Sequence, residues 1–404
     1  MHHDPQKFRA FHPELETIEI DGRGLTSEGR IRALTRCLRK VKPVIALPMS
    51  LVEANQAVSR CKVSGQDVRL MIHAQGNLPP MLADLRYFHP VIDHVVCPGR
   101  LTQAVLQSWA GFSAGRLSHI PNGAACAQHK HRDNRSGPLR LGFVGRFSQL
   151  DKRVLDMIGL VRQLKEKNVP FSLRIVGQGG EESTLRSALE EYPEVTFCGA
   201  MSQDMLYRDF YPLIDVLVLF SASEAFGIVL AEAMMNGVVP VTSQFIGFFA
   251  EKLVIEEGTG LSFPVGDVEQ AANQIRRLYV NPELRMRLSE QGRQHAESNY
   301  RWDSSLKRWE ECFRRVVDLT PLRADGTTES QWPDSPGRLD RLGVPAAVTD
   351  VFRRIRRKLI GPAVPGGGTE WPLHNIHYSS ADLAEVSAAC QCAEQAARTE
   401  VNAT

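Results

Sequence analysis

The feature that most constrains the fold is a regular alternation of short apolar runs and helical spacings that begins at residue 139. LRLGFV (139–144) and SLRIVG (172–177) are strand-like runs, and VLDMIGLVRQLKEK (154–167) between them has helical spacing. Three more β-branched runs, VTFCG, DVLVLF and VVPVT, follow with helical stretches between them. Buried strands that alternate with helices are typical of a parallel sheet covered on both faces. The sequence therefore predicts a doubly wound α/β domain over residues 139–300.

The first 123 residues show a fainter version of the same alternation. IRALTRCLRKV has helical spacing, while VRLMIHA and DHVVC have the composition of strands. A nucleotide-binding half usually opens with a strand and a Gly-rich turn, whereas this chain opens with the polar segment MHHDPQKFRAFHPELE. We therefore expect residues 1–123 to form a second Rossmann-like domain that is incomplete.

Composition marks the remaining boundaries. Residues 124–138 (AACAQHKHRDNRSGP) are polar and basic with almost no large apolar side chain, which is typical of a linker. A helix is expected at 301–318, and after it residues 319–404 contain the turn-rich stretches TPLRADGTTESQWPDSPGR and GPAVPGGGTEW. We expect this tail to be loosely ordered.

Segment 348–360 of the tail (VTDVFRRIRRKLI) is predicted to form a basic amphipathic helix. Its apolar residues recur at the spacing of one helix face: Val348, Val351, Phe352, Ile355 and Leu359. Five basic residues occupy the other faces: Arg353, Arg354, Arg356, Arg357 and Lys358. Such a helix is typical of one that lies on an anionic membrane surface, and equally of one that packs its stripe against the protein with solvated arginines outside.

Charge and cysteine content narrow the classes of function. Lys and Arg (48) nearly balance Asp and Glu (46), so no global field draws the chain to nucleic acid. The eight cysteines form no C-x-x-C pair, which favours reduced thiols in a chain of this size. No run approaches the ~18 apolar residues of a membrane span, and the N-terminus lacks an apolar core of signal-peptide length. We expect a cytoplasmic protein with no nucleic-acid partner.

The first candidate site element follows the strand LRLGFV, which runs into Gly145 and Arg146, with Lys152 at the start of the next helix. A glycine lets the backbone approach a ligand, an Arg can donate hydrogen bonds to two phosphate oxygens at once, and a Lys supplies a point charge. These residue types suit a diphosphate. Solvated surface charges show the same spacing, so this element alone leaves both interpretations open.

The second element is the IVGQGGE turn, in which Gly177, Gly179 and Gly180 follow a strand and precede a helix. Such a turn lies at the carboxyl edge of the sheet, where open α/β sheets bind ligands. An ordinary tight turn between a strand and a helix has the same composition.

The third element, SASEAFGIVLAEAMMNGVVPVTS (221–243), is the most specific. Glu224 lies in a turn just after the strand DVLVLF. The next helix starts near Gly227, and its unpaired N–H donors form a natural anion site: those of Phe226, Gly227 and Ile228.

Glu232 lies in the same predicted helix, roughly 8 Å further along its axis at 1.5 Å per residue. That separation is near the distance between a pyrophosphate and its ribose, and a carboxylate can accept hydrogen bonds from both ribose hydroxyls. A surface position is the alternative, but the neighbours of Glu232 are nearly all apolar. Because a buried carboxylate without partners costs several kcal/mol, a binding role is favoured.

Four stretches, in this order and spacing, resemble the family-four retaining glycosyltransferases: VGRFSQLDK, LRIVGQGGEESTLRSAL, VTFCGAMSQDMLYRDFY and SEAFGIVLAEAMMNGVVPVTS. PNGA (121–124) resembles the end of that family's first domain, and TGLSFPVGDVEQAANQI (259–275) the last strand and helix of its second. The helix at 301–318 resembles the one that crosses back to the first domain. The resemblance implies the GT-B fold, in which two Rossmann-like domains face a cleft that holds the active site.

The resemblance also implies roles for the matching residues. Arg146 and Lys152 would hold the donor diphosphate, and Glu224, the first residue of an E-x(7)-E pair, would lie by the donor sugar. Glu232 would hold the ribose, and the N–H groups at Phe226 and Gly227 would reach the phosphates. His73 in LMIHAQGN matches a histidine near the donor sugar, although a histidine at a strand end is as often structural.

Taken together, these residues predict a retaining glycosyltransferase that moves a sugar from a nucleoside diphosphate sugar to a saccharide or lipid-linked acceptor. The resemblance implies a place in cell-envelope polysaccharide or glycolipid synthesis, with weak contact of segment 348–360 with the inner membrane face. No metal-binding D-x-D follows a strand, so we expect no metal and no other cofactor.

Two alternatives stay open. The family's opening strand and Gly-rich acceptor loop have no counterpart in this sequence, which is also compatible with an inactive donor-binding subunit or a truncated remnant. A nucleotide-sugar epimerase of related architecture would place the Arg and Glu residues at a different spacing.

Overall fold

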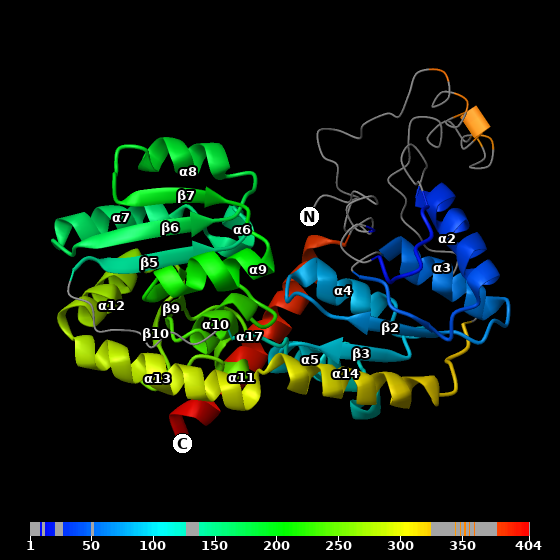
Figure 1. The fold of residues 1–404 in the computed structure, drawn as a ribbon. Helices are drawn as coiled ribbons and strands as arrows, with labels where there is room; N and C mark the ends of the chain where they lie inside the picture. Colours follow the sequence, from blue (N-terminus) through cyan, green and yellow to red (C-terminus); the bar gives the residue numbers. More distant parts are fainter. Residues whose placement is uncertain are drawn as a thin grey trace.

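The computed structural model describes residues 13–20, 27–49, 52–126, 137–324 and 378–403, together with single positions elsewhere. In this part of the chain two α/β domains lie side by side, each around its own parallel sheet (Figure 1). The predicted fold class, with two Rossmann-like domains of the GT-B kind, is confirmed.

The second domain is built on a six-stranded sheet in the order β10-β9-β8-β5-β6-β7, in which every pair is parallel. The strands are β5 (Leu139–Val144), β6 (Phe171–Val176), β7 (Val195–Gly199), β8 (Val216–Leu219), β9 (Val239–Ser243) and β10 (Leu261–Phe263). The strand order reverses between β5 and β8, because the chain adds β6 and β7 on one side and then returns to the other. Open α/β sheets bind ligands outside the carboxyl ends of the strands at such a switch point.

Helices cover both faces of this sheet, since every residue of β8 and β9 is buried. The principal helices are α7 (Asp156–Glu166), α8 (Glu182–Leu189), α10 (Ile228–Met235), α12 (Val268–Val280) and α13 (Pro282–Asn299). Short helices fill the connections: α6 (Gln149–Lys152), α9 (Gln203–Met205), η2 (Leu206–Phe210), η3 (Tyr211–Leu213) and α11 (Phe248–Glu251). The central strands of this sheet are therefore covered on both faces.

The described part of the first domain is a four-stranded parallel sheet in the order β1-β2-β3-β4. Its strands are β1 (Ile45–Ala46), β2 (Arg69–His73), β3 (His94–Cys97) and β4 (Leu117–His119). The helices are α2 (Ser27–Val41), α3 (Val52–Val63), α4 (Pro79–Tyr87), α5 (Arg100–Ser108) and the short η1 (Ala114–Arg116). All four residues of β3 are buried, so this sheet is also covered on both faces.

Helix α14 (Trp302–Val317) runs from the second domain along the first (Figure 1). Its Cys312 and Val316 are buried in one cluster with Met71 and Val96 of the first sheet. At its start, Ala124 is buried and forms a bridge with Arg301. Of the predicted linker, residues 127–136 lie outside the described part of the chain.

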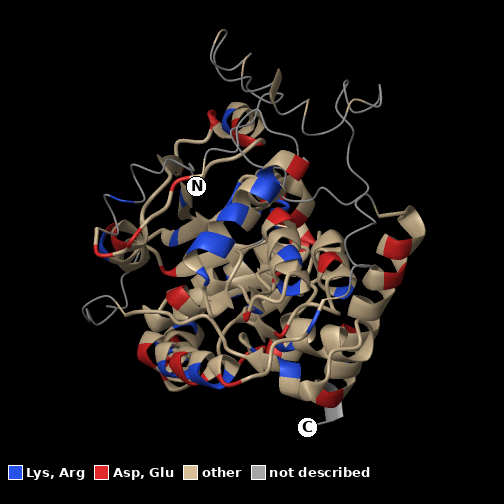
Figure 2. Cartoon of the chain, turned by 90° about the vertical axis from the view of Figure 1, so that its right-hand side faces the viewer, with Lys and Arg blue, Asp and Glu red and all other residues tan. Residues whose placement is uncertain are grey.

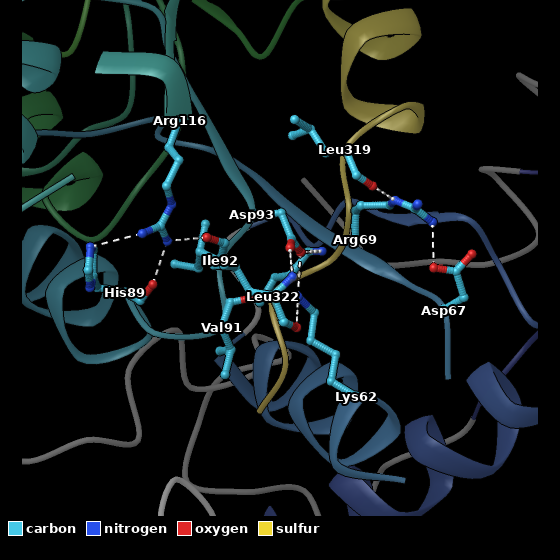
Figure 3. A network of polar contacts seen from close by, with 11 residues as sticks. Lys62, Asp67, Arg69, His89, Val91, Ile92, Asp93, Arg116, Leu319 and Leu322 are labelled. Atoms are coloured by element: carbon cyan, nitrogen blue, oxygen red, sulfur yellow. Dashed lines mark hydrogen bonds and ion pairs between the residues drawn. The ribbon is translucent and has the colours of Figure 1, made fainter. Parts of the chain in front are cut away.

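A buried ion pair fixes the segment after α14 to the first domain (Figure 3). The Asp93 carboxylate pairs with Lys62 and accepts hydrogen bonds of 2.6 Å from the backbone N–H groups of Leu70 and Leu322. The Lys62 ammonium also donates to the carbonyls of Val91 (2.8 Å) and Leu322 (3.2 Å). Because each charge has hydrogen-bond partners besides its counter-ion, the pair meets the condition under which proteins tolerate buried charges.

The tail contains a helix that the sequence analysis did not predict. Helix α17 (Ser380–Ala403) lies between the two domains and packs against α4, α5 and α11 (Figure 1). Its Val386 and Cys390 are buried in the core of the first domain. The expectation of a loosely ordered tail is therefore wrong for residues 380–403. The contact face of this helix consists of small and medium side chains, which are a weaker sequence signal than a leucine stripe.

The predicted amphipathic helix at 348–360 is described only at its apolar positions. These are helical and exposed: Val348, Val351, Phe352, Ile355 and Leu359. Burial of this stripe against the protein, one of the two sequence-based alternatives, is therefore not observed at these positions. The five basic residues, Arg353, Arg354, Arg356, Arg357 and Lys358, lie outside the described residues.

Charged residues of both signs are interspersed over the side of the molecule seen in Figure 2. Within the part of the chain that the structure describes, no helix has the length and apolarity needed to cross a membrane.

Candidate functional site

The glycine-rich turn after β6 packs tightly on the turn after β5. A Cβ atom at Gly177 would lie 1.9 Å from the Gly145 carbonyl oxygen, and one at Gly179 would lie 2.5 Å from the Phe147 carbonyl oxygen. Gly177 also has a φ of +145°, which side-chain-bearing residues rarely adopt. Close packing of the two turns thus accounts for both glycines, and it places the first two candidate elements next to each other.

Lys152 and Glu224 form an ion pair at the switch point, where β5 and β8 lie side by side. Their side chains are 16% and 12% exposed, and the Glu224 Oε1 atom also accepts a 2.6 Å hydrogen bond from the Ser221 hydroxyl. The Ala222 N–H donates to the Asp151 carbonyl at 2.8 Å, which fastens the end of α6 to the turn that carries Glu224. The structure therefore joins two site residues that are 72 positions apart in the sequence.

Arg146 lies on the same edge but reaches a different partner. Its guanidinium pairs with Asp151 at 2.7 Å, and its side chain is 69% exposed. The Asp151 side chain is only 10% exposed, so the pair joins an exposed guanidinium to a buried carboxylate. The structure does not bring Arg146 into contact with Glu224.

Helix α10 begins at Ile228, directly after the turn of Glu224, with Gly227 as its N-cap residue. Gly227 has a φ of +81°, a left-handed conformation that glycine adopts without strain, and Phe226 is buried. The N–H groups that the sequence analysis selected, at Phe226, Gly227 and Ile228, thus stand at the predicted helix start.

Glu232 is buried, as its apolar flanks predict, and three protein side chains donate to its carboxylate. Tyr211 donates to Oε2 at 2.7 Å, while Tyr207 (3.1 Å) and Gln203 (3.0 Å) donate to Oε1. Burial raises the pKa of Glu232, against the opposing effect of these three donors. Burial also raises the pKa of Tyr207 to about 12. These three donors were not among the site residues expected from the sequence, although they belong to the VTFCGAMSQDMLYRDFY stretch.

His73 ends β2 of the first domain and packs edge-on against Trp309 of α14, with 5.2 Å between the ring centroids. Its Nδ1 atom is 3.4 Å from the Gln75 amide, and its Nε2 atom is buried without a hydrogen-bond partner among the described residues. Burial lowers the pKa of His73 to about 4, so the ring is neutral at pH 7. These surroundings suit a structural histidine, and the orphaned Nε2 atom leaves room for a ligand hydrogen bond.

The first domain contacts the Glu224 turn through residues that the sequence analysis did not select. The Asn77 amide donates to the Glu224 carbonyl at 2.7 Å and accepts from the Thr102 hydroxyl at 2.6 Å. Gly99 lies so near that a Cβ atom there would be 1.8 Å from the Ala225 carbonyl oxygen. The turn is thus held from both domains.

A second contact between the domains is centred on Glu251, the last residue of α11. Its Oε2 atom accepts from the Arg100 N–H at 2.9 Å and lies 3.2 Å from the His119 Nε2 atom. The residues that the structure describes contain no group of three His, Cys, Asp or Glu side chains arranged to hold a metal ion.

Sequence comparison finds that the region containing this site is similar to known proteins. Residues 127–295 match the family described as glycosyl transferases group 1. The chain is 27% identical over 215 residues to a glycogen synthase of Mycobacterium tuberculosis, which covers 52% of this chain and 51% of that protein. It is 29% identical over 170 residues to the N-acetyl-alpha-D-glucosaminyl L-malate synthase of Bacillus anthracis, covering 41% and 43%. The matched region spans about half the length of these relatives.

Solved structures share the fold. Sucrose-phosphate synthase from Thermosynechococcus elongatus superposes with a TM-score of 0.61 at 19% identity, covering 72% of this chain and 77% of the other. The pneumococcal O-GlcNAc transferase in complex with UDP and GlcNAc gives 0.60 at 16% identity, covering 72% and 61%. The fold and the strand-end residues agree with the match of residues 127–295 to the glycosyl transferases group 1 family.

Proposed function

We propose that the chain is a retaining glycosyltransferase that moves a sugar from a nucleoside diphosphate sugar to a saccharide or lipid-linked acceptor. We place this reaction on the cytoplasmic side of cell-envelope polysaccharide or glycolipid synthesis. The observation that carries the proposal is the Lys152–Glu224 ion pair at the switch point, with the buried Glu232 about one turn into α10. The relatives named glycogen synthase and lipopolysaccharide 1,2-N-acetylglucosaminetransferase support a saccharide acceptor.

In the proposed mechanism the protein stabilises charge that develops as the glycosidic bond to the diphosphate breaks. Lys152, Arg146 and the N–H groups at the start of α10 face the negative charge that gathers on the leaving diphosphate. The Glu224 carboxylate lies beside the sugar, where positive charge develops. A bound donor phosphate would compete with Glu224 for Lys152.

The ribose is proposed to bind at Glu232. In this proposal the ribose hydroxyls donate to the Glu232 Oε1 atom and replace the hydrogen bonds that Gln203 and Tyr207 donate to it. The fully buried Tyr211 continues to donate to Oε2. A carboxylate that is already ordered by its partners loses little entropy when the ribose arrives.

Ligand-detected NMR with UDP-, GDP- and ADP-sugars tests this proposal. We expect one nucleotide class to bind, and we expect the sugar of the product to keep the anomeric configuration that it had in the donor. A product of inverted configuration would refute the retaining mechanism. Binding without transfer to any acceptor would indicate an inactive donor-binding subunit, and absence of binding would refute the proposal as a whole.

Removal of divalent metal is expected to leave turnover unchanged. The proposed counter-charges of the leaving diphosphate are Lys152, Arg146 and the helix N–H groups, so no Mg²⁺ is needed for that task. The measurement is the initial rate after dialysis against EDTA, with and without added Mg²⁺. Loss of rate in EDTA that Mg²⁺ restores would contradict the metal-free proposal.

We also propose that segment 348–360 binds weakly to anionic membranes through its exposed apolar stripe and its basic residues. Each basic residue near such a surface contributes about 1 kcal/mol, so the expected result is salt-sensitive co-sedimentation with anionic vesicles. Replacing Phe352 and Leu359, which are 60% and 78% exposed, by serine should reduce pelleting without unfolding the protein. Equal pelleting of the two proteins, or pelleting that is indifferent to salt, would exclude this role.

A further inference from the structure

Helix α17 is fastened to the first domain over its first half. Its Glu385 side chain accepts hydrogen bonds from Arg86 (3.0 Å) and from the Trp109 indole (2.9 Å). Val386 and Cys390 are buried among the core residues of the first domain. Just before the helix, the Tyr378 hydroxyl donates to the Asp84 carboxylate at 2.8 Å. These contacts anchor the helix on α4 and α5.

The second half of α17 contacts the second domain through Glu394. This side chain is only 9% exposed, and its two carboxylate oxygens accept hydrogen bonds from the N–H groups of Gly247 (3.1 Å) and Phe249 (2.9 Å). One turn further, the Arg398 guanidinium lies over the Phe249 ring, 5.2 Å from its centroid. Hydrogen bonds to a charged acceptor are among the stronger ones in proteins, so this contact holds the 246–249 turn firmly.

The 246–249 turn lies directly against the turn that carries Glu224. The Ile246 carbonyl accepts from the Glu224 N–H at 3.3 Å, and the Ile246 N–H donates to the Ala222 carbonyl at 3.0 Å. Gly247, at a φ of +109°, is so near that a Cβ atom there would lie 2.8 Å from the Glu224 carbonyl oxygen. Any shift of the 246–249 turn is therefore passed to the backbone of Glu224.

We propose that α17 is a strap between the two domains and that Glu394 is a positioning residue, which holds the 246–249 turn against Glu224. Glu394 touches no substrate in this proposal. Its part in donor recognition rests on the proposed function, whereas the strap itself does not. Because Glu224 is proposed to lie by the sugar, loosening the turn affects recognition of the sugar more than recognition of the nucleotide.

Two glutamate-to-glutamine variants of the full chain test the strap. Glu394→Gln keeps the size of the side chain but offers one acceptor oxygen in place of two, while Glu385→Gln alters the same helix where it contacts the first domain only. The first readout is hydrogen exchange of the amides in residues 244–252. We expect Glu394→Gln to speed their exchange by about tenfold or more, as loss of a hydrogen bond to a charged group predicts, and Glu385→Gln to leave it unchanged.

The second readout is the affinity for UDP-glucose and GDP-mannose compared with that for free UDP and GDP. We expect Glu394→Gln to weaken binding of the nucleotide sugar several-fold more than binding of the free nucleotide, and Glu394→Asp to restore part of the loss. A purely structural role would weaken both ligands alike and would overturn the positioning role.

Unchanged exchange of residues 244–252 in Glu394→Gln would overturn the strap. If the unaltered chain binds neither nucleotide sugar nor nucleotide, the proposed function fails. The hydrogen exchange of the amides in residues 244–252 then still decides whether α17 acts as a strap. Should Glu394→Gln fail to fold, Glu394→Asp keeps the charge with a shorter reach, and the same comparison of exchange rates is made with it.

Discussion

Replacing Glu232 by alanine is expected to weaken binding of the nucleoside diphosphate by about 1–3 kcal/mol, the usual cost of losing hydrogen bonds to a charged group. The proposed ribose hydroxyls lose their acceptor in this variant. The Tyr211 hydroxyl, which is fully buried, also loses its 2.7 Å partner, so some loss of folding stability accompanies the change. Isothermal titration with the nucleotide found by NMR measures the first effect, and thermal unfolding measures the second.

A matched control separates the two effects. Glu256→Ala removes the carboxylate of an exposed residue in the same domain, which also accepts two hydrogen bonds: from the Ser262 N–H and from the Ser262 hydroxyl, both at 2.6 Å, in the edge strand β10. This variant should lose stability without losing nucleotide affinity. Unchanged affinity in a folded Glu232→Ala variant would remove Glu232 from the site.

The raised pKa of Glu232 predicts a pH dependence of the same interaction. The ionised carboxylate is the better acceptor, and burial brings its protonation to a higher pH than that of an ordinary glutamate. Nucleotide affinity should therefore fall as the pH is lowered through this raised pKa, and Glu232→Gln, which cannot titrate, should lack that part of the fall.

Local pattern was sufficient to predict most of the second domain. The strand predicted at 139–144 is observed as β5 with the same bounds, and the helix predicted at 154–167 is observed as α7 at Asp156–Glu166. The residues of each element are enough to predict it: β5 is a continuous apolar run, and the apolar residues of α7 recur at helical spacing. The burial of Glu232 followed in the same way from its neighbours.

Contacts between distant parts of the chain could not be predicted in this way. The hydrogen bond from Asn77 to the Glu224 carbonyl joins residues 147 positions apart, and that from Phe249 to Glu394 joins residues 145 apart. The residues around Asn77 and Glu394 do not indicate which groups they contact. The pattern within one helix or strand does not determine how two domains and a tail helix pack together.

Replacing both Arg146 and Lys152 by alanine is expected to reduce turnover more than donor affinity. Negative charge on the diphosphate grows as the bond to the sugar breaks, so the lost cations matter most in the transition state. Loss of one such preorganised donor commonly lowers kcat by about 10²–10³-fold, and we expect a fall of at least this size. Initial rates over a range of donor concentrations give kcat and KM separately.

The structure makes Lys152 the more important of the two. Its removal takes away the counter-ion of Glu224, a side chain only 12% exposed, and leaves the Ser221 hydroxyl as the partner of Oε1. Arg146 is 69% exposed and pairs with Asp151, not with Glu224, so its single variant should show the smaller loss. A double variant of Lys165 and Arg186, two ion-paired surface cations of the same domain, controls for the change in net charge. Full kcat with only a raised KM in the Arg146 and Lys152 double variant would show that these cations bind the donor equally in ground and transition states, which contradicts the proposed leaving-group role.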